Sequence, residues 1–388
     1  MNKKRETVSL AGSVAAVLAA MTLTTGTAFG QAVPGGTLDP LSIPKYVTPL
    51  VIPPVMNDSG TTNDYDIAVR QFKQQILPTG FPATTVWSYG PADEDRDAVA
   101  ALTAPSPASQ FNYPAYTIEA TKDTSITVDW VNDLVDPATG NYRPHLLPID
   151  RTLHWANPEG IPCDGGKVKD CRPDPSALSD PKILQEPYTG PVPIVVHVHG
   201  AHVGPESDGY PEAWWLPDAN NIPGEYSIEG TLVNGYSRMT NNNPGVASFE
   251  YPNDQPSTTL WYHDHTLGMT RNNVYAGPAG FWLIRDAETG ETGLDSGTLP
   301  GPAPLPGQDV LSLNVPGNPV RAAVREIPIV IQDRSFNADG SLFYPANRAF
   351  FEGIGDGQLS GYNANPDVGL NIETIGNVKK KKKDNRAE

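Results

Sequence analysis

Short segments in which apolar and polar residues alternate constrain the fold of this chain more than any other feature. Alternation puts one set of side chains on each face of an extended strand, as in a half-buried β-sheet. The 388 residues include 40 prolines and 36 glycines, which interrupt the chain too often for long helices. The alternating segments are Pro114–Ala120, Ser125–Trp130, Val192–His199, Val246–Tyr251, Thr259–His263 and Ala279–Arg285. The pattern predicts an all-β sandwich or barrel with long loops.

Residues 1–30 are typical of an export signal. A basic start at Lys3–Arg5 precedes an apolar stretch, and Ala28 and Gly30 are small residues suited to cleavage. No other apolar run approaches the length of a transmembrane helix. We therefore expect an exported protein, periplasmic or extracellular, with no membrane attachment after signal cleavage. The general secretory and twin-arginine routes both stay open.

Residues 31–110 are rich in proline and predict a loop-like segment that leads into the first domain. One helical stretch is expected within it, at about Tyr65–Ile76. Residues 111–287 hold all six alternating segments and predict the first complete β-domain.

The carboxyl-terminal part changes composition twice. Residues 288–325 are rich in Gly, Pro, Thr and Ser and predict a linker. A strand pattern returns at Glu326–Gln332, but residues 326–378 are too few for a sandwich domain. We therefore expect an incomplete second domain. Residues 379–388 form an aberrant basic tail that starts with five lysines, and a frameshift or sequencing error there is one hypothesis, with true truncation as its rival.

Net charge excludes one class of partner. The formal charge is −17 at pH 7, and an acidic body repels phosphate backbones, so we expect no nucleic-acid binding.

The two cysteines, Cys163 and Cys171, lie close together in a polar loop. In an oxidising compartment this favours a local disulfide, with a two-cysteine metal site as the alternative.

Four of the seven histidines form two His-x-His pairs. The pairs are His197 with His199 and His263 with His265, and each follows a strand pattern. Residues i and i+2 of a strand share a face, so each pair can present two imidazoles to one point. Imidazole is a ligand for both copper and zinc, and the spacing alone does not choose between them.

Other residues near these pairs have simpler explanations. A single His-x-His on a strand often binds no metal. We interpret His145, His154 and His202 as surface residues or neighbours of the ligands. We interpret Trp214 and Trp261 as core residues rather than electron relays.

The residues around the pairs resemble the copper motifs of bacterial multicopper oxidases. His197–His202 followed by Ser207–Trp214 resembles the first motif, and Thr259–His265 with Thr270–Gly280 resembles the second. The resemblance is to spore-coat-type laccases and bilirubin oxidases. Weaker similarity extends from Pro114 to Tyr344. It implies a cupredoxin-like Greek-key domain, followed here by an incomplete second cupredoxin domain.

The resemblance also implies a copper chemistry. Family members are oxidases in which a type 1 copper takes electrons from a small reducing substrate, and a trinuclear cluster reduces dioxygen to water. By position, His197 and His199 would serve the type 2 and type 3 coppers, and His263 and His265 the type 3 pair. Asp208 matches an acidic position near the cluster. It is a hypothetical proton relay, and its alternative role is to stabilise the turn before Gly209.

The ligand count departs from the family pattern. The family uses eight histidines for the cluster and a His-Cys-His block for type 1 copper, and neither Cys163 nor Cys171 has such neighbours. The type 1 site is therefore absent from this chain, and a missing carboxyl-terminal cupredoxin domain would be needed to complete the trinuclear site. We expect a laccase-like oxidase as the intended product and no oxidase activity from the 388 residues alone. The alternatives are a non-catalytic copper-binding fragment and a fragment that misfolds.

Overall fold

The computed structural model describes residues 37–48, 50–56, 63–103, 109–174, 176–177, 188–233, 244–285 and 327–345. Its strands are β1 (Asp64–Gln74), β2 (Thr84–Pro91), β3 (Ile118–Thr121), β4 (Ile126–Asn132), β5 (Val196–His199), β6 (Val246–Tyr251), β7 (Thr258–Asp264), β8 (Ala279–Arg285), β9 (Ser335–Phe336) and β10 (Leu342–Phe343). Its short helices are η1 (Pro40–Ser42), α1 (Arg96–Ala100), η2 (Asp164–Gly166) and α4 (Thr270–Ala276). The expected signal, linker and basic tail lie outside the described residues.

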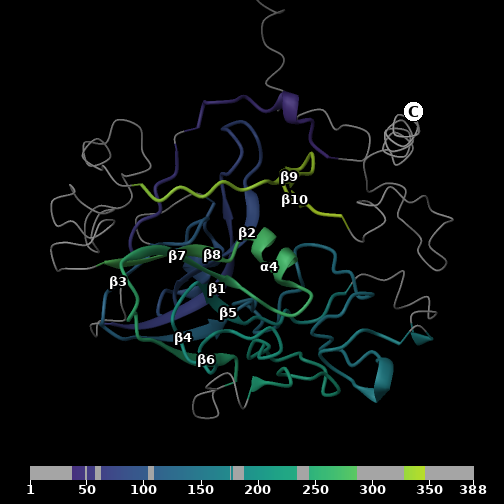
Figure 1. Cartoon of the computed structure of the whole chain (residues 1–388). Helices are drawn as coiled ribbons and strands as arrows, with labels where there is room; N and C mark the ends of the chain where they lie inside the picture. Colours follow the sequence, from purple (N-terminus) through teal and green to yellow (C-terminus); the bar gives the residue numbers. More distant parts are fainter. Residues whose placement is uncertain are drawn as a thin grey trace, which may run out of the picture.

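Two four-stranded sheets form the body of the fold (Figure 1). The first has the order β2-β1-β4-β6 and the second β3-β8-β7-β5. Each contains one parallel pair, β1 with β4 and β3 with β8, and the other neighbours are antiparallel. Consecutive strands from β4 to β7 change sheet at every connection, so the sheets cannot form independently. The all-β prediction is confirmed.

Aromatic side chains fill the space between the sheets. Tyr89 of β2 lies 5.4 Å, between ring centroids, from Trp130 of β4 and 5.4 Å from Tyr262 of β7. Trp130 and Tyr262 are 5.6 Å apart, and all three side chains are buried. Because Tyr262 comes from the second sheet, this cluster joins the two layers. Burial of such large rings is a main source of stability in a core of this kind.

Each of the six alternating segments overlaps an observed strand. The register confirms why they alternate: in β4, Ile126, Val128 and Trp130 face the core, and the residues between them are less buried. The bounds shift by a few residues, because strand ends depend on the partner strand.

The helix predicted at Tyr65–Ile76 is wrong, because these residues form β1. This strand lies between β2 and β4 and is buried on both faces, so the alternation that marks a half-exposed strand is obscured. Its Gln, Lys, Arg and Ala residues favour helix intrinsically, but pairing with two neighbours overrides that preference. The loop-like character expected for residues 31–110 is likewise wrong for β1 and β2, which belong to the first sheet.

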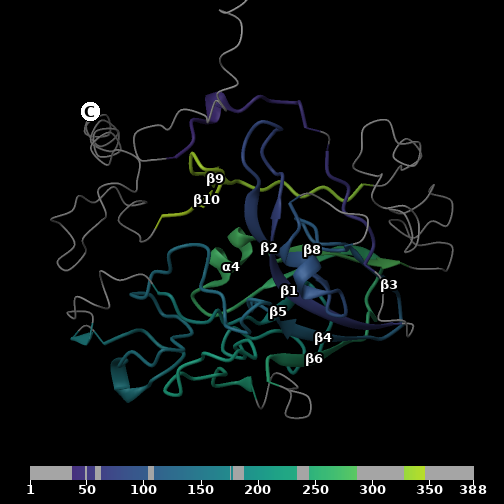
Figure 2. The ribbon, with the colours of Figure 1, turned by 180° about the vertical axis from the view of Figure 1, so that it is seen from behind.

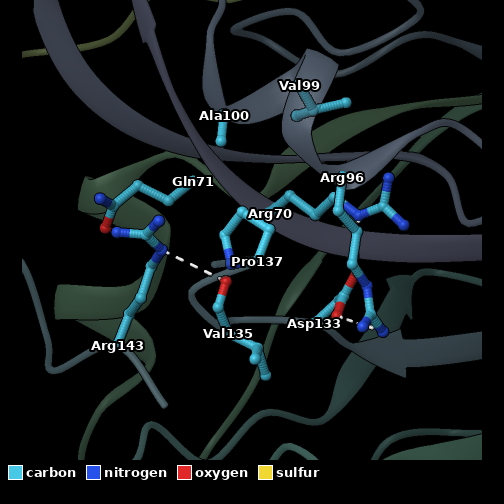
Figure 3. Close-up of a pocket in the computed structure, with 9 residues that line it drawn as sticks. All are labelled: Arg70, Gln71, Arg96, Val99, Ala100, Asp133, Val135, Pro137 and Arg143. Atoms are coloured by element: carbon cyan, nitrogen blue, oxygen red, sulfur yellow. Dashed lines mark hydrogen bonds and ion pairs between the residues drawn. The ribbon is translucent and has the colours of Figure 1, made fainter. Parts of the chain in front are cut away.

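A buried carboxylate ties the first sheet to the adjoining helix. Asp133, directly after β4, accepts from Nε of Arg70 on β1 at 2.6 Å and from Nη2 of Arg96 on α1 at 2.8 Å. Arg70 also donates to the carbonyls of Glu94 and Ala92, so each of its three guanidinium nitrogens has a partner. Figure 3 shows these side chains lining a small pocket that contains none of the four paired histidines.

The long loops that follow β4 and β5 pack inward rather than outward. Trp155 and Trp215 are fully buried, and Trp215 forms isolated β-bridges to Ile194 and Glu229. Cys163 and Cys171 are joined by a disulfide, as expected. These contacts hold an irregular segment of the chain against the second sheet.

The strand expected at Glu326–Gln332 does not form within the described residues 327–332. Ile331 is 95% exposed and has no strand beside it, and β-branched residues make strands only where a neighbour completes the ladder. The hairpin β9–β10 follows and packs back on the first domain. Figures 1 and 2 show it beside the amino-terminal segment, where Leu38 N donates to Phe336 O at 2.7 Å.

Among the described residues, no helix is both long enough and apolar enough to cross a membrane.

Asp133→Asn should lower the free energy of unfolding by about 3–5 kcal/mol, because it leaves two arginines without their buried carboxylate. The matched control is Asp136→Asn, whose partner Arg143 lies 3.0 Å away in a more exposed pair. That change should cost less than about 1 kcal/mol. Urea unfolding followed by tryptophan fluorescence measures both. Equal losses would contradict a special role for the buried pair.

Candidate metal centre

The two His-x-His pairs lie on neighbouring antiparallel strands. His197 of β5 is directly opposite His263 of β7 in the register, and His199 is opposite Trp261. Val196, Val198 and Tyr262 are buried on the other face of the same strands. The alternation of each strand therefore places apolar side chains in the core and imidazoles together on one face.

The four imidazoles form one cluster, here called the four-imidazole site. The ring centroid of His197 lies 5.5 Å from that of His199, 5.6 Å from that of His263 and 5.1 Å from that of His265. His263 lies 5.8 Å from His199 and 5.7 Å from His265. His265 follows the end of β7, yet it joins the group because its backbone N donates to Val195 O beside β5.

Backbone carbonyls select the tautomer of two of these rings. Nδ1 of His263 lies 2.7 Å from the carbonyl oxygen of Asp264, and Nδ1 of His197 lies 2.5 Å from that of Asp208. A carbonyl can only accept, so each Nδ1 carries the proton. In the neutral ring Nε2 then holds a free lone pair. Nε2 of His263 is buried without any hydrogen-bond partner, and so is Nδ1 of His265.

Burial keeps these imidazoles neutral. Burial is the largest cause that lowers the pKa of His263 to about 4; the hydrogen bond to the Asp264 carbonyl opposes the shift, and the neighbouring imidazoles act in the same direction as burial. Burial also lowers the pKa of His265, with His197 contributing in the same direction. The neutral ring is the form that binds a metal ion. The orphaned, buried lone pairs therefore fit a metal, since buried polar atoms otherwise find partners.

The cluster is nevertheless open. Within the part of the chain that the structure describes, no three His, Cys, Asp or Glu side chains are grouped as a self-sufficient site for one ion. His199 is exposed and His263 is buried, so one side of the group faces outward. Metal ions held here would need ligands from outside the four.

Asp208 lies against the first histidine pair. Its carbonyl contacts His197, and its carboxylate Oδ1 is 3.4 Å from the same Nδ1. The chain reaches this position through Gly209, which has a φ of +75° and packs so closely on Val196 O that a Cβ would collide with it. The turn therefore brings Asp208 to the edge of the site.

Trp261 corrects an interpretation made from sequence. It was expected in the core, but it is 39% exposed and stacks on the rings of His263, at 4.0 Å, and His199, at 5.6 Å. Its position opposite His199 places it on the imidazole face of β7 rather than the core face. Trp214 is fully buried, as expected.

The remaining histidines lie outside the cluster. His202 is 66% exposed and pairs with Asp254 at 3.3 Å, and His154 is exposed with Nε2 near Asp170 O. His145 is half-buried, and its Nε2 lies 3.0 Å from Oδ1 of Asn273. It is thus a neighbour of the site rather than a surface residue.

Sequence reasoning missed Asp264 and Asn273. Asp264 is fully buried between two of the imidazole-bearing residues, and Nδ2 of Asn273 donates to its Oδ1 at 2.9 Å. An aspartate at a core-facing position of a strand was the available signal, because buried carboxylates are rare unless several groups donate to them.

Comparison with known proteins places this site in context. No family model matches the sequence. A laccase of Bacillus stratosphericus is 29% identical over 79% of this chain and 41% of its own length. A laccase of Haloferax volcanii is 30% identical over 78% of this chain and 37% of its own length. A solved multicopper oxidase of Aquifex aeolicus is 16% identical with a TM-score of 0.37, covering 78% of this chain and 39% of that one.

The chain thus spans about two fifths of the length of the curated relatives that it matches. The alignments with these two laccases cover more than three quarters of this chain. The two histidine motifs resemble copper motifs of the same class of enzyme. These matches support a laccase-like multicopper oxidase family for this chain, and that family consists of oxidoreductases.

Proposed function

We propose that this chain supplies half of the trinuclear copper site of a laccase-like oxidase. The observation that carries the proposal is the four-imidazole site, with a buried, unpartnered ring nitrogen on His263 and another on His265. Copper is the metal of choice because the relatives are multicopper oxidases. Imidazole nitrogen suits that ion.

His197 and His199 would each hold one copper, of type 2 and of type 3, and His263 and His265 would hold the type 3 pair. Bound copper would supply the reversible one-electron steps that side chains do not. The chain's own contribution is to hold neutral rings at fixed orientation. The carbonyls of Asp208 and Asp264 do this for His197 and His263.

The complete enzyme would couple two half-reactions. Four one-electron oxidations of a small reducing substrate, such as a phenol, would supply the electrons that convert one dioxygen and four protons to two waters. The other cluster ligands and the type 1 copper would come from a further cupredoxin domain. Trp261 and His199 are exposed on the open side of the site, where such a domain can dock.

We also propose that the protein is exported, on the basis of residues 1–30.

Asp208 is the proposed proton donor to reduced oxygen. Its carboxylate is partly exposed and lies beside His197, so it can exchange protons with solvent at the edge of the site.

A second candidate function is copper binding without turnover. The exposure of His199 favours it, because copper ions can reach the site in this chain alone. A test for turnover uses the purified 388-residue chain, loaded with copper, and a laccase dye. We expect no dye oxidation, since type 1 copper has no site here. Turnover that tracks copper content would exclude the non-catalytic candidate. A chain that is insoluble, or melts without cooperativity, would instead indicate a misfolded fragment.

Removing one proposed ligand should weaken copper binding strongly. His263→Ala should lower Cu²⁺ affinity by more than about 100-fold, beyond the usual effect of losing a residue that only supports a ligand. The matched control is His202→Ala, which removes an exposed imidazole outside the site. Isothermal titration calorimetry measures both. Similar affinities for the two variants would show that copper does not bind at the four-imidazole site.

Asp208→Asn should separate proton delivery from ligand orientation, because the backbone carbonyl that contacts His197 is retained. In a catalytically complete version of the protein, turnover should fall by about 10–100-fold and its dependence on pH should change. Asp254→Asn, in an exposed pair, is the control. Steady-state rates across pH give the result, and an unchanged profile would remove Asp208 from the mechanism.

A further inference from the structure

The carboxylate of Asp264 lies beneath the four-imidazole site. In β7 it faces the core, opposite to His263, and it is paired with Val196 of β5 in the register. Among the described residues, none of the four site histidines forms a hydrogen bond with its carboxylate. Its hydrogen-bond donors come from several separate segments.

Four hydrogen bonds converge on this carboxylate. Thr266 donates through its backbone N and through Oγ1, each at 3.0 Å, and Nδ2 of Asn273 donates at 2.9 Å. Val195 N donates at 3.3 Å from the residue that precedes β5. The carboxylate therefore links the start of β5, the end of β7 and helix α4. A buried carboxylate needs such a set of donors.

Asn273 transmits this link further from the site. Its Nδ2 donates to Asp264 and to Pro193 O at 3.1 Å, so both amide hydrogens are used and the orientation of the amide is fixed. Its Oδ1 must then face His145. Because Oδ1 can only accept, Nε2 of His145 carries the proton and donates at 3.0 Å.

His145 is itself held on both sides. Leu147 N donates to its Nδ1 at 2.8 Å, and its ring packs edge-on against Trp87 of β2 with centroids 4.6 Å apart. Burial lowers the pKa of His145 to about 4, so the ring is neutral at neutral pH. A chain of hydrogen bonds thus runs from His145, through Asn273 of helix α4, to Asp264 of β7, and His145 contacts the first sheet by packing on Trp87.

We propose that Asp264, Asn273 and His145 form the positioning network of the four-imidazole site. By fixing the start of β5 against the end of β7, the network sets the spacing between the two histidine pairs. The inference rests on the proposed metal-binding function, but it concerns the protein that holds the ligands and not the copper. Outer partners of metal ligands commonly change metal affinity about 10–100-fold when removed.

Helix α4 offers a matched control for this network. Asn272 is adjacent to Asn273 and equally buried, and its Nδ2 donates to Pro148 O at 3.0 Å. Among the described residues, none of its hydrogen bonds reaches Asp264. Asn272→Ala and Asn273→Ala therefore remove the same group from the same helix, with one hydrogen bond lost in the first and three in the second. Only Asn273→Ala should disturb the histidine pairs.

The experiment compares these two variants in the full 388-residue chain, with Cu²⁺ alone as the probe. Asn273→Ala should lower Cu²⁺ affinity by about 10–100-fold. Asn272→Ala should stay within about threefold of the unmodified chain. The Cu²⁺ electron paramagnetic resonance spectrum should change only in Asn273→Ala. Equal losses and equal spectra in the two variants would overturn the inference. If Asn273→Ala does not fold, His145→Phe keeps a ring against Trp87 and removes the hydrogen bonds that the imidazole makes with Asn273 and Leu147.

A second readout needs no metal. Long-range ¹H–¹⁵N spectra of the metal-free chain should show His145 protonated at Nε2 and His263 at Nδ1. In Asn273→Ala the ring signals of the four site histidines should shift, whereas Asn272→Ala should leave them in place. Unmoved ring signals in Asn273→Ala would also overturn the inference. If the unmodified chain bound no Cu²⁺ but the ring signals moved as expected, the proposed function would fail and the positioning network would stand.

Discussion

The antiparallel pairing of β5 with β7 is the interaction on which the rest of the site depends. It places His197 directly opposite His263, and the period of two brings His199 to the same face. A shift of one residue in this register would turn the imidazoles into the core and the buried side chains Val198 and Tyr262 outward. The apolar face therefore fixes the position of the polar one, because exposing it would cost burial energy.

The core below these strands is built to hold that register. Tyr262 packs against Tyr89 and Trp130 of the first sheet, so the two layers meet directly behind the histidines. Asp264 adds a polar contact at the same depth, where unpaired charge would be costly and four donors are provided. Rigid aromatic packing and directed hydrogen bonds thus act on one strand from the side opposite to the ligands.

The four-imidazole site has an open side, and the chain spans only about two fifths of the length of its curated relatives. The four imidazoles lie together but do not close around one ion within the described residues. Trp261 stacks on two of them and is partly exposed. The proposed further cupredoxin domain would dock against this aromatic surface and bring its ligands to the unpartnered ring nitrogens.

The sequence by itself determined the all-β class, the six strands that alternate and the two His-x-His pairs, because each follows from local periodicity or spacing, and it favoured the disulfide. Only the tertiary structure decided that Tyr65–Ile76 is a strand, since its burial on both faces comes from neighbours distant in sequence. It also decided that Trp261 is exposed, and that Asp264 reaches Asn273 and, through it, His145. These contacts join residues up to 128 positions apart, and no local pattern records them.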